Sequence, residues 1–147
     1  MKELLITIGK NAKKAFSNSL SYKKKNKVLK NYQKIIIIKK TRIINENKKD
    51  LYLANQKKLK ANLVKRLTLD KKKISLIIES IKSIKKFKDP VNYVLEKWQR
   101  PNGLKISKVT TPIGVISVIY ESRPNVTSDV ASLCFKSGNP VILKGGS

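Results

Sequence analysis

The C-terminal quarter of the chain carries the pattern that most restricts its fold. The stretch IGVISVIY, Ile113 to Tyr120, is apolar almost without a break, which is typical of a strand buried on both faces of a parallel sheet. Four side chains then recur at helical spacing: Val126, Val130, Leu133 and Cys134. A second short strand, PVILK, follows at Pro140 to Lys144. A strand, a helix and a strand within about 30 residues predict a βαβ unit with a right-handed crossover.

The ends of these elements locate a candidate site. Asn125 or Thr127 is suited to cap the start of the helix, and Gly138 is suited to end it. The segments that follow the two strands, residues 121–125 and 144–147, would emerge at the same carboxyl edge of the sheet. Open α/β sheets bind their ligands at this edge, so we expect the functional residues there.

The residues at that edge suit a nucleotide. Lys144 offers a point charge with three donors to a ribose hydroxyl or a phosphate, and the glycines 145–146 let the backbone approach a ligand closely. The Asn125 amide is able to donate to a developing oxyanion. The same residues have structural alternatives: a cap for Asn125, an ion pair between Arg123 and Glu121, and a plain turn for the glycines. Neither glycine-rich phosphate-loop fingerprint is present.

Residues 1–90 are predicted to be helical, with three apolar stripes that we interpret as packing surfaces. The first helix, capped by Ser21, has this stripe: Val28, Leu29, Tyr32, Ile35 and Ile36. The second, residues 41–55, has these inward residues: Ile43, Ile44, Leu51 and Ala54. The third, capped by Asp70 and stopped at Asp89-Pro90, has this stripe: Ile74, Ile77, Ile78, Ile81 and Ile84.

A β-hairpin is predicted between the helices and the βαβ unit. Two β-prone runs, Val91 to Gln99 and Leu104 to Thr111, flank the turn residues Arg100 to Gly103. The Asn-Gly pair in this turn favours a tight hairpin because both residues tolerate a positive φ. Tyr93 and Trp98 lie on the ribbon. The sequence leaves open whether this ribbon is an oligomerisation arm or a plain edge hairpin.

The chain is strongly basic, with 34 Lys and Arg against 9 Asp and Glu and a formal net charge of +25. Such a charge is typical of proteins that bind nucleic acid or anionic membranes. Here 30 of the 34 basic residues are Lys, and residues 111–147 contain only 3 of the 34. Arg, the better residue for bidentate phosphate contacts, is nearly absent. We therefore interpret the lysines as a solvated surface from an AT-rich coding sequence, and keep a small nucleic-acid or anionic-surface binding protein as the alternative.

The single cysteine and the absence of histidine limit the chemistry. One thiol, Cys134, excludes an internal disulfide and fits a reducing cytoplasm. Because Cys134 falls on the apolar helical stripe, we expect a buried structural thiol rather than a nucleophile. Without His there is no ordinary zinc site, and we expect no metal. No run approaches the length of a membrane span, so the chain is expected to be soluble and cytoplasmic.

The stretches GVISVIYESRPNVTSDVASLC and KSGNPVILKGGS closely resemble glutamate-5-semialdehyde dehydrogenases, also called gamma-glutamyl phosphate reductases, of the aldehyde dehydrogenase superfamily. Weaker likeness lies in NENKKDL, RLTLDKKKI and KDPV, in the same order and spacing, so the resemblance spans essentially the whole chain. It implies an α/β fold made of N-terminal helices, a hairpin arm and the first, incomplete βαβ unit of a cofactor-binding domain.

The resemblance also implies NADPH-dependent reduction of L-glutamyl 5-phosphate to L-glutamate 5-semialdehyde, with release of phosphate, in proline biosynthesis. Residues 1–90 would be the helical part of the cofactor domain, 91–111 the oligomerisation arm, and 112–147 the start of the Rossmann-like core. By the same resemblance, these residues would bind the cofactor: Glu121, Ser122, Arg123, Pro124, Asn125, Lys144, Gly145, Gly146 and Ser147.

The family's nucleophilic cysteine lies downstream of the matched segment, so we interpret these 147 residues as an N-terminal fragment and expect them to be inactive alone. Asn125 is the one candidate catalytic group, as an oxyanion donor. The implied partners are the small-molecule substrate, glutamate 5-kinase and further copies of the chain, without nucleic acid or membrane. A scaffold that binds the kinase or whole subunits through the hairpin is a third possibility.

Overall fold

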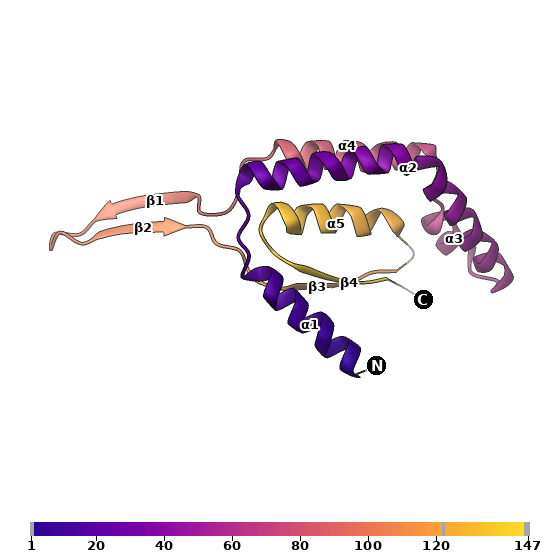
Figure 1. The fold of residues 1–147 in the computed structure, drawn as a ribbon, viewed down its shortest axis with the longest axis horizontal. Coiled ribbons are helices and arrows are strands. Elements are labelled where there is room, and N and C mark those ends of the chain that lie inside the picture. Colours follow the sequence, from indigo (N-terminus) through magenta and orange to yellow (C-terminus); the bar gives the residue numbers. More distant parts are fainter. Residues whose placement is uncertain (1, 122, 146–147) are drawn as a thin grey trace.

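The structure, a computed structural model, describes residues 2–121 and 123–145. Along the chain the elements are α1 (Lys2–Phe16), α2 (Tyr22–Gln56), α3 (Ala61–Leu67), α4 (Lys71–Lys86), β1 (Val94–Gln99), β2 (Lys105–Val109), β3 (Ile116–Ile119), α5 (Pro124–Lys136) and β4 (Val141–Lys144). Figure 1 shows α2 and α4 side by side, α5 between them and the β3–β4 pair, α1 on the other side of that pair, and the β1–β2 hairpin projecting from one end.

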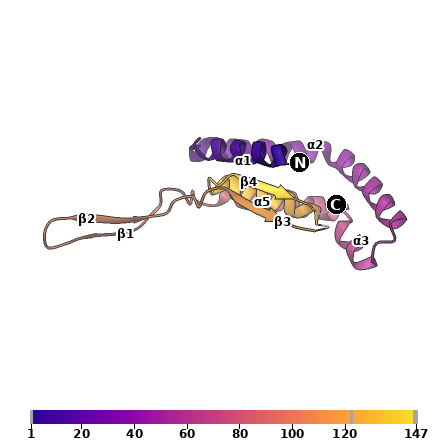
Figure 2. The same ribbon diagram turned by 90° about the horizontal axis from the view of Figure 1, so that it is seen from below.

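The two helices predicted around residues 28–36 and 41–55 are one helix. α2 runs for 35 residues from Tyr22 to Gln56, and Ser21 caps it as predicted by accepting a hydrogen bond from the Lys24 amide. The segment between the two predicted helices contains neither Gly nor Pro, so nothing in the backbone interrupts it. Figure 2 shows that α2 bends in its second half, towards α3.

The core lies between α2 and α4. Its buried apolar residues are Leu29, Ile36, Leu69, Ile74, Ile77, Ile81 and Ile84. The isoleucine stripe of α4 and its Asp70 cap are as predicted, since Asp70 Oδ1 accepts the Lys73 amide at 2.7 Å. The stripe on α2 is narrower than predicted, because Ile35 is 56% exposed and Val28 is also exposed. α4 ends at Lys86, before the predicted stop at Asp89-Pro90.

A buried asparagine connects α2 to the short helix α3, which was not predicted as a separate element. Asn47 Nδ2 donates to Leu67 O at 3.1 Å, and its Oδ1 accepts the Leu69 amide at 2.7 Å. Both groups of Asn47 are therefore satisfied by the turn that leads into α4. The residue that lowers the helix propensity of α2 fixes the position of the next helix.

The hairpin has the predicted antiparallel pairing, with Trp98 opposite Ile106 and Glu96 opposite Lys108. Its turn differs from the prediction. Gly103 has φ +86°, but Asn102 does not have a positive φ, and the Gly103 amide donates to Arg100 O. Pro101 and Asn102 thus form the centre of the turn and Gly103 provides the left-handed residue that follows, because proline cannot adopt a positive φ. We call β1, β2 and this turn the arm.

The predicted βαβ unit is confirmed. β3 and β4 are parallel, with Ile116 opposite Val141 and Ile119 opposite Lys144, and α5 connects them. β3 is shorter than predicted and is not buried on both faces, since Ile119 is 77% exposed among the described residues. Among the described residues, α5 and α1 both pack against β4, while Ile119 of β3 remains exposed.

The helix α5 differs from the prediction in its start and in its buried face. Arg123 occupies the N-cap position without a side-chain cap and Pro124 follows it, so neither Asn125 nor Thr127 caps the helix. Leu133 of the predicted stripe is exposed, and the fully buried residues of α5 are instead Ser128, Ser132, Cys134 and Lys136. Gly138, with φ +74°, follows the end of the helix as predicted.

Candidate functional site

The carboxyl edge of the β3–β4 pair brings the two predicted segments together. Ile119 lies opposite Lys144 in the parallel register, and the Tyr120 amide donates to Lys144 O at 3.0 Å. Glu121 and Gly145 therefore leave the sheet from neighbouring strands. In Figure 1 this edge lies at the end of the molecule opposite the arm. The predicted site residues Ser122, Gly146 and Ser147 lie outside the described residues.

Lys144 is the exposed cation of this edge. Its Nζ donates to the carbonyl of Gly145 at 3.3 Å, and it forms no ion pair within residues 2–121 and 123–145. Because Gly145 has no side chain, the surface beside Lys144 stays open. A Cβ at Gly145 would lie 3.8 Å from the Tyr120 hydroxyl, which is ordinary contact, so packing within the chain does not require glycine here.

Glu121 and Arg123 are both exposed at the start of the crossover. No ion pair joins them among the residues that the structure describes, so the structural alternative for these two side chains is not observed. Their charges are free to face a ligand or solvent. Together with Lys144 they give the edge two cations and one carboxylate.

Asn125 lies in the first turn of α5, where its Nδ2 donates to Asp129 Oδ2 at 3.3 Å. Its amide is exposed and oriented along the helix in this structure. The contact is long and its donor is a neutral amide, so a stronger acceptor at the edge would compete with Asp129. The role of Asn125 as an oxyanion donor remains a prediction.

Sequence reasoning missed the contact between Tyr120 and Thr127, having considered Thr127 only as a helix cap. The Tyr120 hydroxyl and Thr127 Oγ1 are hydrogen-bonded and join the end of β3 to the first turns of α5. This contact joins positions on either side of Glu121 and Arg123. The signal in the sequence was an aromatic residue with a polar group at the end of an apolar strand, since a buried tyrosine usually finds a partner for its hydroxyl.

Cys134 is buried, as predicted, and burial raises the pKa of its thiol above the usual range. A thiol held in its neutral form is a poor nucleophile. No cluster of three or more metal-ligating side chains occurs within the described ranges. In the part of the chain that is described, no helix is long and apolar enough to cross a lipid bilayer.

Two cavities among the described residues lie away from the carboxyl edge. The larger, about 610 Å³, lies between the end of α1, the base of the hairpin and the turn after α5, and Phe16, Leu20 and Phe135 are among its lining residues. A smaller one, about 420 Å³, lies between α2 and α5. Neither of these two cavities is lined by residues of the carboxyl edge, so the assignment of the edge rests on its residues and topology.

Comparison with known proteins finds the same group of enzymes along the whole chain. It is 49% identical over 146 residues to the gamma-glutamyl phosphate reductase of Nautilia profundicola, covering 99% of this chain and 35% of that protein. It is 50% identical over 123 residues to the protein of the same name from Caldanaerobacter subterraneus, covering 84% and 30%. The chain thus spans about a third of the length of the curated relatives it matches. No protein-family model matches it.

Solved structures agree. The crystal structure of gamma-glutamyl phosphate reductase from Thermotoga maritima matches with a TM-score of 0.91 and 36% identity, over 97% of this chain and 35% of that one. The structure of the enzyme of the same name from Saccharomyces cerevisiae matches with a TM-score of 0.91 and 36% identity, over 96% and 36%. Both the sequence and the arrangement of the elements are therefore similar to one third of these reductases.

Proposed function

Because the chain belongs, by sequence and by fold, to the gamma-glutamyl phosphate reductases, we propose that it forms the cofactor-binding start of such an enzyme. The reaction is the reduction of L-glutamyl 5-phosphate to L-glutamate 5-semialdehyde with release of phosphate, a step of proline biosynthesis. The single observation that supports it most is the parallel β3–β4 pair, which places the segments after both strands at one carboxyl edge.

NADPH is the proposed cofactor, and it supplies a hydride when bound. The residues of the edge fit it. Lys144 is exposed with three donors directed to no described carboxylate, Gly145 adds no side chain, and Arg123 brings a second cation. Two cations favour a nucleotide that carries an additional phosphate, whereas Glu121 would favour a free ribose hydroxyl. We propose that the two cations outweigh Glu121 in the choice of nucleotide. Lys144 would contact the ribose or its phosphate, and residues 121–125 would line the cofactor cleft.

Titration of the chain with NADPH, followed by calorimetry, tests this assignment. Lys144→Ala should weaken NADPH binding by about tenfold or more, since it removes a charge-assisted contact. Lys105→Ala, an exposed lysine of β2 far from the edge, is the matched control and should leave the affinity unchanged. Equal affinity of wild type and Lys144→Ala would contradict the role of Lys144, and absence of NADPH binding by the wild type would contradict the proposed function.

These 147 residues supply cofactor contacts and no reactive thiol. Cys134 is their single cysteine, and it is buried with a raised pKa. We propose that the nucleophile comes from the remainder of the reductase and that the chain by itself does not oxidise NADPH in the presence of glutamyl phosphate. Measurable turnover would contradict this. A cytoplasmic location and association with glutamate 5-kinase follow from the same family assignment.

The arm is the proposed oligomerisation element. The side chains of β1 and β2 are almost all exposed, and these large apolar ones are among them: Val94, Leu95, Trp98 and Val109. A two-stranded ribbon has too little apolar contact to be stable on its own, so its exposed face needs a partner. Another copy of the chain is the partner we propose.

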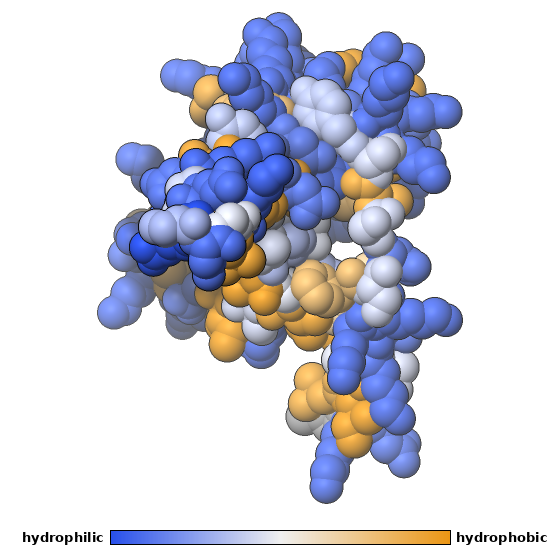
Figure 3. Space-filling view, turned by 90° about the vertical axis from the view of Figure 1, so that its left-hand side faces the viewer, coloured by the Kyte–Doolittle hydropathy of each residue, from blue (hydrophilic) through white to orange (hydrophobic). Residues whose placement is uncertain are grey.

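Nucleic-acid binding remains the alternative for the basic helices. Figure 3 shows hydrophilic residues spread over the face in view rather than gathered in one stripe. A spread of this kind suits solvation better than a track for phosphates. Raising the salt concentration fourfold would lower true polyanion affinity by orders of magnitude, which separates the two functions.

A further inference from the structure

A partly buried ion pair joins the first turn of α2 to the root of the arm, by which we mean residues 89–93 and 110–112. Its lysine, Lys25, is buried, and the side chain of Asp89 is 23% exposed. Lys25 Nζ lies 2.9 and 3.2 Å from the two carboxylate oxygens of Asp89, although 64 positions separate the residues. Lys25 is 2% exposed. A buried ammonium group loses its hydration, and an apolar side chain of similar volume would fill the space without that loss. The pair therefore points to a role other than packing.

The Asp89 carboxylate is also connected by hydrogen bonds to the two segments of the root. Its Oδ1 also accepts the Val91 amide at 3.1 Å. On the other strand of the root, Thr110 Oγ1 donates to the carbonyl of Pro90 at 2.6 Å. Hydrogen bonds therefore run without a gap from Lys25 on α2 through Asp89 to the residues that enter and leave the arm.

The opposite side of the root rests on the turn after α5. A Cβ at Gly138 would lie 3.2 Å from Pro112 Cγ and 3.3 Å from Val91 Cγ2, so the root is in close contact with this turn. The root is thus held at two points, one ionic and one apolar. Two points of attachment on different elements define a direction, whereas one would leave a pivot.

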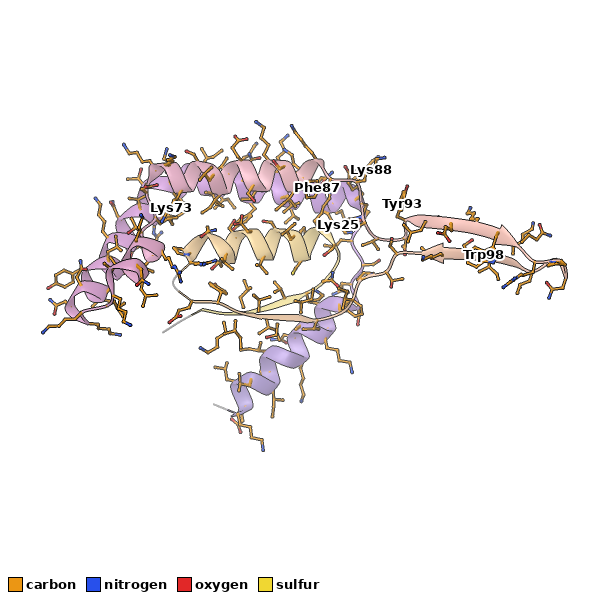
Figure 4. The ribbon with its side chains drawn as sticks, turned by 180° about the vertical axis from the view of Figure 1, so that it is seen from behind. Lys25, Lys73, Phe87, Lys88, Tyr93 and Trp98 are labelled. Atoms are coloured by element: carbon orange, nitrogen blue, oxygen red, sulfur yellow. The ribbon has the colours of Figure 1, made fainter. Side chains whose placement is uncertain are left out.

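Beyond the root, the described residues do little to hold the arm. All of β1 is exposed, and in β2 only Ile106 is partly covered. Figure 4 shows Lys25 where the root meets the helices and Trp98 out on the arm. Six residues of strand span about 20 Å, so a rotation of about 15° at the root would move the tip by about 5 Å. A contact at the root is therefore amplified at the tip.

We propose that Lys25 and Asp89 are positioning residues that fix the direction of the arm relative to the helical layer. We call this pair, Lys25 and Asp89, the clamp. The effect of the clamp on assembly rests on the proposed role of the arm, whereas its effect on the direction of the arm does not. An arm whose direction is set before encounter loses less conformational freedom on binding a partner. The clamp thus makes assembly depend on two residues that lie outside β1 and β2.

The single tryptophan of the chain, Trp98, provides a probe on the arm. Time-resolved fluorescence anisotropy of Trp98 should show a nanosecond component whose amplitude rises about twofold in Lys25→Met and in the isosteric Asp89→Asn. Helix content by circular dichroism should stay unchanged, because neither residue belongs to the apolar core. Lys27→Met, an exposed lysine on the same helix, is the matched control and should behave as the wild type.

Unchanged anisotropy in both folded variants would overturn the clamp. If both variants failed to fold, hydrogen exchange of the wild type decides: slower exchange of the Val91 and Asn92 amides than of the Lys97 amide supports the clamp, and the reverse order overturns it. The mass by sedimentation is measured on the same samples. A freer arm with unchanged assembly would uphold the clamp and contradict the proposed role of the arm in oligomers.

Discussion

The α2–α4 layer and the arm are both rich in large apolar side chains, but they use them differently. The layer buries its isoleucines against each other, whereas β1 and β2 bury none of their residues fully. Two amphipathic helices that lie side by side cover one another's apolar stripes. Two strands pair through their backbones and leave both faces of the ribbon open. The layer is therefore stabilised by contacts within the chain, while the apolar side chains of the arm stay exposed.

The largest effect should come from the centre of the layer. Ile81→Ala removes a side chain with 0% exposure and should lower the free energy of unfolding by about 2–5 kcal/mol through the lost transfer energy and the cavity. Urea unfolding followed by circular dichroism measures it. Ile38→Ala, at a residue 74% exposed on α2, is the control and should change stability by less than about 0.5 kcal/mol. Similar losses in both variants would contradict the internal core.

A smaller loss of unfolding free energy is expected at Asn47, which connects α2 to the turn between α3 and α4. Asn47→Ala leaves the Leu67 carbonyl and the Leu69 amide without their partner and should cost about 1–3 kcal/mol. The exposed Asn45→Ala should instead raise helix propensity slightly. Chemical denaturation of the two variants side by side checks the difference. If Asn47→Ala were as stable as Asn45→Ala, the tie between α2 and α3 would be refuted.

Replacing a glycine by alanine should change stability in opposite directions in the arm and in α1. Gly103→Ala places a Cβ at φ +86° in the turn of the arm and should destabilise it by about 1 kcal/mol. Gly9→Ala, inside α1 with open space around it, should stabilise that helix by about 0.5–1 kcal/mol. Residue-resolved hydrogen exchange separates the two regions, and a loss of protection outside the arm in Gly103→Ala would speak against an independent arm.

The smallest effect is a pH dependence at the junction of α5 with the layer. Desolvation lowers the pKa of Lys136, although Tyr22 and Asp89 oppose the shift; its Nζ donates to Asn26 Oδ1 at 2.7 Å and lies 4.2 Å from the centre of the Tyr22 ring. A lysine pKa that is lower in the folded state makes stability fall as pH decreases through the interval between the unfolded and folded values. Relative to Lys136→Met, the wild type should gain stability as pH rises towards the normal lysine pKa, and a parallel dependence in both would contradict this.

Much of the fold and part of the site followed from local patterns. The spacing of Ile74, Ile77, Ile81 and Ile84 predicted the buried face of α4, and the strand–helix–strand pattern predicted the parallel pair with Lys144 at its carboxyl edge. The Tyr120–Thr127 contact was not predicted, because it depends on where the first turn of α5 lies relative to the end of β3. Asn125 was predicted as a possible cap, but α5 begins at Pro124, so Asn125 lies inside the helix.

By itself, the sequence determined that residues 1–90 are helical and that a hairpin and a strand–helix–strand unit follow them, since periodicity, caps and glycines act over a few residues. Only the tertiary structure decided which apolar rows are covered, why Ile35 is exposed while the polar Asn47 is buried, and that Lys25 meets Asp89. The physical reason is that burial and the pairing of buried charge depend on which distant surface lies opposite a residue. That surface is set by packing, which no local pattern encodes.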